Sequence, residues 1–148
     1  MTNFNVETLR ALLARVEAAT GPDRKIDAAI AVTIDGGPKS FTSDDAPDRT
    51  RGSYGAGIWF TDADNYHVLS KTVRCAALIT ASIDAAVALI ERVLPEWIWD
   101  VTSTGTSWIM AGDESDLHVP AKGATPALAI LAAIFRALIH IEEGRAND

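Results

Sequence analysis

The segment Glu96–Gly112, "EWIWDVTSTGTSWIMAG", decides the fold class of this chain. Two apolar runs, around Trp97–Thr102 and Ser107–Ala111, flank a polar stretch that turns through Thr104 and Gly105. Aromatic and β-branched residues on both sides of a glycine-containing turn are typical of a β-hairpin. We therefore predict two antiparallel strands joined by a loop of two or four residues.

Either loop length gives the same register, which pairs Val101 with Trp108 and Trp99 with Met110. Paired residues share a face, so one face is expected to carry Trp97, Trp99, Val101, Trp108 and Met110. The other face would carry Ile98, Ile109 and Ala111, with Asp100 as its only charge. A sheet that is apolar on both faces needs cover on both. The predicted fold class is therefore α+β: a layered α/β/α sandwich whose small, mostly antiparallel sheet has helices on both faces.

The segment before the hairpin predicts a helix that begins after Ser82 and stops at Pro95. Asp84 would lie in its first turn, where a negative charge interacts favourably with the helix dipole. The buried stripe of this helix is predicted to consist of Ile83, Val87, Ile90 and Leu94.

The segment after the hairpin predicts a long helix. Thr125 is a good N-cap, and Pro126 suits the first helical position. The helix is expected to run to about Glu142, with Gly144 just past its end. Apolar residues go nearly all the way round it, so it is either central in the domain or buried by a partner subunit. The second alternative predicts a homo-oligomer that forms through this last helix.

The N-terminal part of the chain predicts two more helices with a break between them. Asn5 is the N-cap of the first helix, and Gly21 is a natural C-terminal glycine. The apolar stripe of that helix consists of Val6, Leu9, Leu12, Leu13 and Val16. Pro22 and Asp23 would begin a second, short helix that runs into extended chain near Val32–Ile34.

The middle of the chain has a different composition. Residues 36–57 are rich in Gly, Pro, Ser and Asp and show no helical or strand period, so they predict a long irregular surface loop. Ile58–Phe60 and Tyr66–Leu69 predict short strands, and Val73–Ile79 fits either a strand or a buried loop. All of these segments are expected to belong to a single domain over residues 1–148.

Composition and charge narrow the function classes. The chain has 148 residues and a net charge of −7, which argues against binding to nucleic-acid polymers and to anionic membranes. Cys75 is the only cysteine, which excludes an internal disulfide and suits a reducing cytoplasm. The N-terminus lacks the basic flank and apolar core of a signal peptide. The most apolar run, Ala124–Ile141, contains Arg136 and is expected to be a buried helix rather than a membrane span.

Two groups of residues could carry chemistry, and each has a simpler interpretation. Cys75 would need a base from His67, His118 or His140, but no local spacing ties it to any of them, so we predict a structural thiol. Oxygen-rich segments occur at Asp62, Asp64 and Asn65 and at Asp113, Glu114, Asp116 and His118. Exposed turn carboxylates explain both segments. We therefore predict a non-enzymatic protein with no catalytic residues, no cofactor and no metal.

The tryptophans Trp59, Trp97, Trp99 and Trp108 fit either a buried sheet face or an open stacking pocket. Core packing is favoured, because helices are expected to cover that face. If a pocket exists, cations of the middle region would supply its anion-binding groups. The predicted ligand-binding residues are then Arg49, Arg51, Trp59, Lys71 and Arg74. Arg24 either faces a ligand or pairs with Asp27 or Glu17, and the pairing is favoured.

Three motifs follow one another along the chain: "ATGPDRKIDAAIA", "TASIDAAVALIERVLPEWIWDV" and "GATPALAILAAIFRAL". Together they resemble the phage ABA sandwich domain, a small family found in phages and prophages. The resemblance covers Ala18–Ala31 and Thr80–Leu138 and leaves Gly36–Ile79 unmatched. It implies helices layered around a central sheet, and it implies no activity and no catalytic residues.

These observations predict a phage- or prophage-encoded accessory protein that is not an enzyme and acts in the host cytoplasm. The first hypothesis is a binding module that captures a small molecule, such as a nucleotide signal of host defence. The alternative is a self-associating structural or virion-associated protein whose last helix forms the interface. A function specific to this chain could lie in the unmatched residues 36–57.

Overall fold

The computed structural model describes residues 4–35, 39–42, 58–61, 73–75, 79–112 and 117–146. The chain divides into two compact units: unit 1 consists of Met1–Asp23 and Ile79–Asp148, and unit 2 of Arg24–Leu78. The expectation of one domain over residues 1–148 stays a prediction, because compactness does not decide whether the two units fold together.

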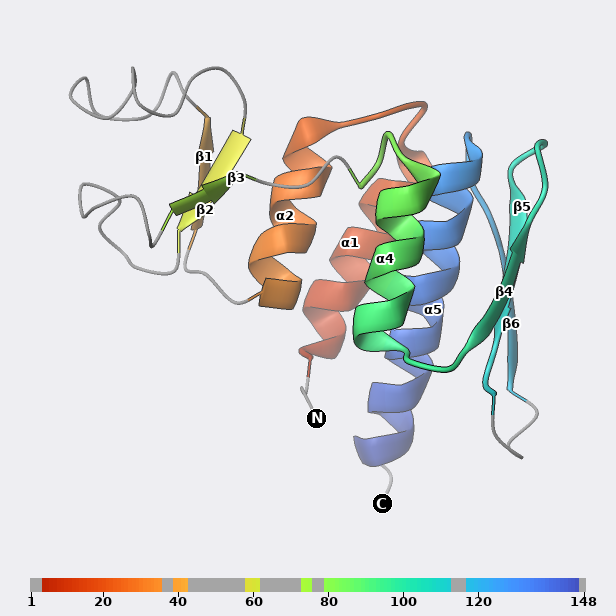
Figure 1. Cartoon of the computed structure of the whole chain (residues 1–148). Coiled ribbons are helices and arrows are strands. Elements are labelled where there is room, and N and C mark those ends of the chain that lie inside the picture. The colour runs from red at the N-terminus through yellow and green to blue at the C-terminus, as the bar shows by residue number, and fades with distance from the viewer. Residues whose placement is uncertain are drawn as a thin grey trace. The chain divides into compact units, whose positions relative to one another are not determined.

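Unit 1 is a small α+β fold in which helices pack against an antiparallel sheet, as predicted. Its elements are α1 (Val6–Ala18), α4 (Ile83–Val93), β4 (Ile98–Val101), β5 (Thr106–Met110), β6 (His118–Lys122) and α5 (Pro126–Ala146). The three strands form a sheet in the order β4-β5-β6, and both pairs of neighbours are antiparallel. Helix α5 lies along one face of this sheet, with α1 and α4 beyond it (Figure 1).

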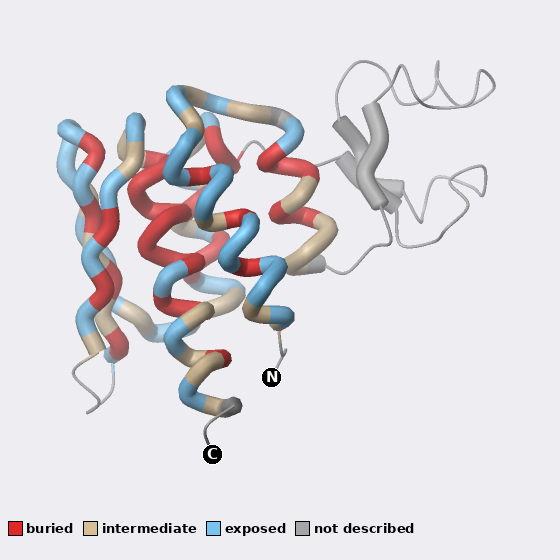
Figure 2. The backbone as a smooth tube through the Cα atoms, turned by 180° about the vertical axis from the view of Figure 1, so that it is seen from behind, coloured by how far each residue is buried: buried red, intermediate tan, exposed pale blue. Residues whose placement is uncertain are grey.

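Helix α5 is the centre of unit 1. Every residue from Ala127 to Phe135 is buried, and this part of the helix is coloured as buried in Figure 2. Ile134 has no exposed surface. Of the two alternatives predicted for this helix, the central position is therefore the one found. The apolar circumference that suggested a homo-oligomer interface is used inside the chain. The helix also runs on to Ala146, so Gly144 lies within it and not past its end.

The helix starts predicted from cap residues are confirmed. The side chains of Asn5, Ser82 and Thr125 each accept a hydrogen bond from the backbone N–H three residues later, at 3.0, 3.2 and 3.2 Å. These bonds satisfy N–H groups that have no partner within the helix. The end of α1 differs from the prediction, because the helix stops at Ala18, before Gly21.

The buried stripe of α4 is rotated from the predicted one. The residues that face the core are Ala86, Leu89, Ile90 and Leu94. Ile83, predicted to be buried, is 41% exposed. Ile90 and Leu94 are buried as predicted, whereas Ala86 and Leu89 take the places predicted for Ile83 and Val87.

The predicted hairpin exists, but the predicted register differs from that of the structure by one residue. Trp99 pairs with Ile109, and Asp100 pairs with Trp108. The reason is the loop: Thr102 N–H donates to Thr106 O at 2.8 Å, which leaves three residues between the strands. Such a loop ends on a residue with positive φ, and Gly105 has a φ of +87°. An odd loop length shifts every side chain of one strand to the opposite face.

Strand β6 was not predicted, and it changes the layers. Its alternation of exposed and buried residues, in the sequence "HVPAK", is that of a strand with one face on a core. The helices of unit 1 all lie on one side of the sheet, whereas we expected cover on both (Figure 1). Within the described residues the second face is open, since Ile98 is 49% exposed and His118, Pro120 and Lys122 are exposed.

Unit 2 consists of α2 (Arg24–Asp35) and the strands β1 (Lys39–Thr42), β2 (Ile58–Thr61) and β3 (Val73–Cys75). The strands form an antiparallel sheet in the order β1-β2-β3, and α2 packs against β1 and β2. Strand β2 confirms the predicted strand, whereas β1 lies inside the range predicted to be an irregular loop. Val32–Ile34 is helical and not extended. The predicted strand Tyr66–Leu69 lies outside the described residues.

The chain leaves unit 1 at Asp23 and returns to it at Ile79. Asp23 N–H donates to Thr80 Oγ1 at 2.8 Å, and the same hydroxyl donates to Asp23 O at 3.2 Å. Thr80 is only 1% exposed. A buried threonine thus ties together the two points where the chain crosses between the units.

Candidate functional site

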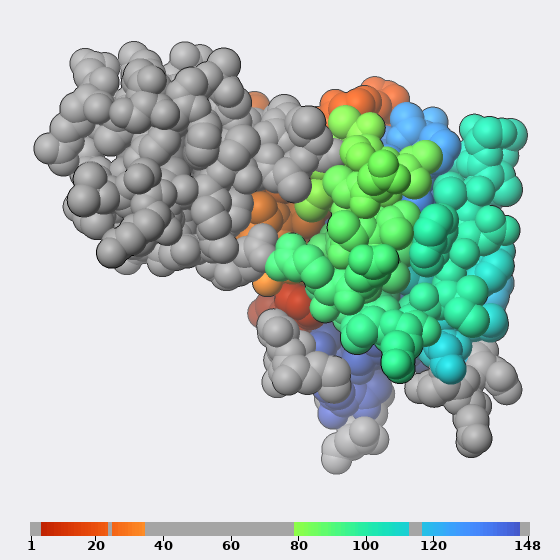
Figure 3. All heavy atoms as spheres, in the orientation of Figure 1, coloured from red at the N-terminus to blue at the C-terminus, as the bar shows by residue number. Residues whose placement is uncertain are grey.

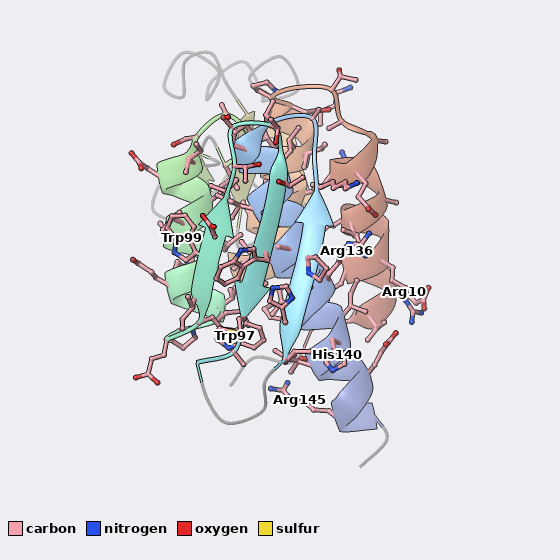
Figure 4. The ribbon with its side chains drawn as sticks, turned by 90° about the vertical axis from the view of Figure 1, so that its right-hand side faces the viewer. Arg10, Trp97, Trp99, Arg136, His140 and Arg145 are labelled. Atoms are coloured by element: carbon pink, nitrogen blue, oxygen red, sulfur yellow. The ribbon has the colours of Figure 1, made fainter. Side chains whose placement is uncertain are left out.

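The open face of β4-β5-β6 is the candidate functional site, and we call it the outer face. The register places its nine residues in three rows across the sheet, and Thr102, the residue just after β4, takes the β4 position in the last row. The rows are Ile98, Met110 and His118; Asp100, Trp108 and Pro120; and Thr102, Thr106 and Lys122. Figure 4 looks onto this face, with α5 behind the strands. The arrangement puts Trp108 at the centre.

Trp108 is held at the middle of the outer face by its neighbours. Its side chain is half-buried, and its ring centroid lies 5.5 Å from that of His118, with 32° between the ring planes. Pro120 lies directly opposite it on β6, and Asp100 lies opposite it on β4. The central strand therefore fixes an aromatic ring between two residues at its sides, and a planar group could stack on it.

The outer face is apolar at one end and polar at the other. Three hydroxyls meet at the polar end: Thr102 Oγ1 lies 2.9 Å from Thr104 Oγ1 and 2.6 Å from Thr106 Oγ1. Lys122 is in the same row. At the apolar end, Ile98 is largely exposed. A ligand with one apolar and one polar part fits this division.

The ionisable residues of the outer face lie on opposite strands. Asp100 is on β4, whereas His118 and Lys122 are on β6. The two basic residues flank Trp108 diagonally, at a spacing that long side chains can bridge. An anionic group would therefore be attracted to the β6 side and repelled from the β4 side.

The opposite face of the sheet anchors the site. Ile109, the neighbour of Trp108 on β5, has no exposed surface. Ser107, on the other side of Trp108, donates from Oγ to Ala129 O of α5 at 2.7 Å. Because both neighbours are fixed to the core, the position of Trp108 is set by a rigid element and not by a loop.

A second polar surface runs along α1 and α5, but its arginines already have carboxylate partners. Arg136 binds Glu17 at 2.7 Å, and Arg10 binds Glu143. Figure 4 labels both arginines beside α1 and α5. Each of these two guanidinium charges is thus already balanced by a neighbouring carboxylate. Glu17, one of the partners predicted for Arg24, thus binds Arg136.

The side chains of the predicted ligand-binding residues all lie outside the part of the structure that is described. Arg49, Arg51 and Lys71 lie outside the described residues. Trp59 lies on β2 and Arg74 on β3, where the register pairs Trp59 with Cys75 and Arg74 with Phe60. Trp59 and Arg74 are therefore not cross-strand partners. The predicted site stays a prediction.

The tryptophans of unit 1 correct the prediction of core packing. Trp97 and Trp108 are half-buried, and Trp99 is 38% exposed. The shifted register is the cause, because it puts Trp108 on the outer face and Trp99 on the other face, at the edge of the sheet. The sequence signal for this site is the alternation of polar or exposed residues with small apolar residues in "HVPAK". That alternation predicts a strand, which would lie beside Trp108 as β6 does.

The other sequence candidates are not brought together where the structure describes them. Cys75 lies on β3, His67 lies outside the described residues, and His118 and His140 are exposed on β6 and α5. Within the described ranges, no three His, Cys, Asp or Glu residues are grouped so that they could hold a metal ion. Asp62, Asp64, Asn65, Asp113, Glu114 and Asp116 lie outside those ranges. None of the helices described has the length and apolar character that a bilayer crossing requires.

The fold and the outer face together define a small α+β protein with an exposed aromatic sheet surface. No protein-family model, curated protein or solved structure matches the chain. The resemblance to the phage ABA sandwich domain therefore depends on the three sequence motifs alone and stays a prediction.

Proposed function

We propose that this chain is a non-enzymatic binding protein that takes up a small planar ligand on its outer face. The observation that carries the proposal is the position of Trp108, half-buried at the centre of an open sheet face. The other face of the same strand is packed on α5, so the ring is presented without the cost of ordering a loop. Aromatic side chains on a rigid sheet are a general means of binding planar groups.

A nucleotide is the ligand class that best fits the surroundings of Trp108. Stacking of one base on an aromatic ring contributes about 1–3 kcal/mol. Lys122, at the polar end of the outer face, would meet the phosphate on the β6 side, and Asp100 would repel it from the β4 side. The net charge of −7 opposes an anion at long range, so the proposed affinity depends on these local groups and on salt.

The absence of enzymatic activity is part of the proposal. In the part of the chain that the structure describes, neither His118 nor His140 hydrogen-bonds a serine, threonine or cysteine side chain. A nucleophile and its base would need such a contact. Ligand capture without turnover is the simpler use of this surface.

We further propose that the protein is an accessory protein of a phage or prophage and acts in the host cytoplasm. The three motifs that resemble the phage ABA sandwich domain support the origin. A nucleotide signal of host defence would be a fitting ligand for such a protein. The alternative of self-association through the last helix stays a prediction, and residues 127–135 of that helix offer no surface for it, because they are buried within the chain.

The test is a titration of the wild-type chain with a nucleoside, its monophosphate and a dinucleotide, by thermal shift and calorimetry. We expect Trp108→Ala to weaken binding by about tenfold or more, because the stacked ring is lost. Lys122→Ala should weaken binding of the phosphorylated ligands and leave the nucleoside unchanged. Trp99→Phe is the matched aromatic control, since Trp99 lies on the other face.

Two results would count against the proposed function. The first is a wild-type chain whose melting temperature and heat signal do not respond to any of these ligands. The second is a folded Trp108→Ala variant that binds a responding ligand as tightly as the wild type does.

A further inference from the structure

The two edges of β4-β5-β6 each carry a feature that hinders pairing with another strand. The sheet order puts β4 at one edge and β6 at the other. An open edge presents N–H and C=O groups to which a further strand can pair. In an antiparallel sheet these groups alternate along a strand between inward and outward positions, so the direction of one hydrogen bond fixes the directions of the others.

On β4 the outward positions follow from the end of the hairpin. Thr102 N–H donates to Thr106 O, so Thr102, Asp100 and Ile98 turn their N–H groups toward β5. The N–H groups of the residues between them point away from the sheet. Figure 3 shows this hairpin at the surface of unit 1, next to α4.

Most outward N–H groups at the β4 edge are already used. Val101 N–H donates to Asp100 Oδ1 at 2.9 Å, so the N–H group at the last residue of β4 is not available to an added strand. Trp97 N–H, just before the strand, donates to Leu94 O at 3.2 Å. Trp99 is thus the one residue of the described β4 edge whose outward N–H has no described acceptor. A carboxylate on the edge also repels strands of like charge.

The β6 edge is closed in a different way. Gly123 N–H donates to Gly105 O at 2.9 Å, so every second residue before Gly123 also turns its backbone N–H toward β5. The outward positions are therefore those of His118, Pro120 and Lys122. Proline has no N–H, and Pro120 occupies the middle of the edge with a charged lysine beside it. An added strand would find no donor at its central position.

We infer that both edges of this sheet are closed to strand addition, so that a partner strand does not extend the sheet. The class of partner that this excludes is an extended peptide strand, including β4 or β6 of a second copy of the chain. Asp100 and Pro120 are the residues that close the two edges. The inference goes beyond the proposed function and does not depend on which ligand the outer face binds.

The experiment opens the edges one at a time and together. Asp100→Ala removes the acceptor for Val101 N–H, and Pro120→Val supplies the missing donor at the middle of β6. We expect the molar mass of the double variant, measured by light scattering, to rise with concentration to about twice the wild-type value or more. Asp100→Asn keeps an acceptor oxygen and should associate less than Asp100→Ala does.

Thr106→Val is the matched control for the edge variants. It makes the same outer face more apolar and more strand-prone, but Thr106 lies on the central strand, so no edge N–H changes. A folded double variant with the mass profile of the wild type would overturn the inference. Equal association of Thr106→Val would overturn it as well, because apolar character and not the edges would then explain the result.

Hydrogen exchange on the wild-type chain tests the same inference without a substitution. We expect Val101 N–H to exchange more slowly than Trp99 N–H, since only the former has a described acceptor. Equal exchange rates would show that Asp100 does not close the edge. These measurements need no nucleotide, so their failure is distinguishable from failure of the proposed function.

Discussion

The two faces of the β4-β5-β6 sheet differ in the side chains that the central strand β5 places on them, and the largest of these lies on the open face. The inner face, against α5, buries small residues such as Ser107 and Ala121, each 7% exposed, beside Ile109. The outer face holds Trp108 and Met110, which are only half-buried. Apolar character alone would have put the larger side chains inside. The strand β5 is apolar on both faces, so another property decides which face meets the helix.

That property is how closely α5 approaches the sheet. A Cβ on Gly123 would lie 2.5 Å from Ala129 N and 2.7 Å from Leu128 C, both of them backbone atoms of α5. The hydroxyl of Ser107 reaches Ala129 O directly. A tryptophan has no room on the inner face of the central strand, where the backbones lie so close together, whereas Trp99 has room on that face because it lies at the edge of the sheet and is 38% exposed. On β5, Ser107 and Ile109 therefore take the inner face, and the open face receives the aromatic ring that the proposed function uses.

The largest expected effect compares neighbouring residues of β5 that face opposite ways. Ile109→Ala removes a side chain with no exposed surface and should lower the free energy of unfolding by about 2–5 kcal/mol. Met110→Ala, on the outer face, should cost about 1 kcal/mol or less, because its side chain is only half-buried. Urea unfolding, followed by tryptophan fluorescence, measures both.

Equal losses for Ile109→Ala and Met110→Ala would contradict this contrast between the faces. They would mean that the outer face is covered in solution as fully as the inner face. In that case the outer face would be an interface, and a dependence of unfolding on protein concentration would show it.

A second substitution tests the close approach of α5 itself. Gly123→Ala places a methyl group against the helix backbone, which must move, so we expect a loss of about 1–3 kcal/mol in the free energy of unfolding. Gly144→Ala is the control, since Gly144 lies within α5 with nothing within 4 Å of the added carbon. That variant should gain about 0.5–1 kcal/mol from helix propensity. A Gly123→Ala variant as stable as the wild type would show that the helix does not approach so closely.

The local features of the fold could be predicted from the sequence. The N-caps Asn5, Ser82 and Thr125 were identified correctly, because a cap is a contact over three residues. The α+β class followed from the hairpin and its flanking helices. These features depend on neighbouring residues, so the sequence order contains the information they need.

The register and the outer face could not be predicted, because both depend on distant residues. Gly105 takes a positive φ where its carbonyl meets Gly123 N–H, a contact across eighteen positions of the sequence that no local pattern shows. Proline is accepted in a strand mainly at a sheet edge, and Pro120 lies on the edge strand β6, a position that the sequence alone does not show. Without β6, the pairing of Trp108 with its neighbours on that strand could not be foreseen. The predicted site in the middle of the chain stays untested.

The smallest expected effect compares two hydroxyl groups on adjacent residues of β5. Ser107 Oγ donates to Ala129 O in the buried layer, whereas Thr106 Oγ1 contacts Thr102 Oγ1 at the exposed end of the outer face. Ser107→Ala should lower the free energy of unfolding by about 1 kcal/mol, the usual contribution of one internal hydrogen bond. Ala129 O keeps its position as a helix acceptor, so no buried group loses its last partner. Thr106→Ala should change the free energy by about 0.5 kcal/mol or less, because water replaces the lost partner. If Thr106→Ala costs as much as Ser107→Ala, the threonine cluster is itself shielded from water, and the polar end of the outer face is more enclosed than its exposure indicates.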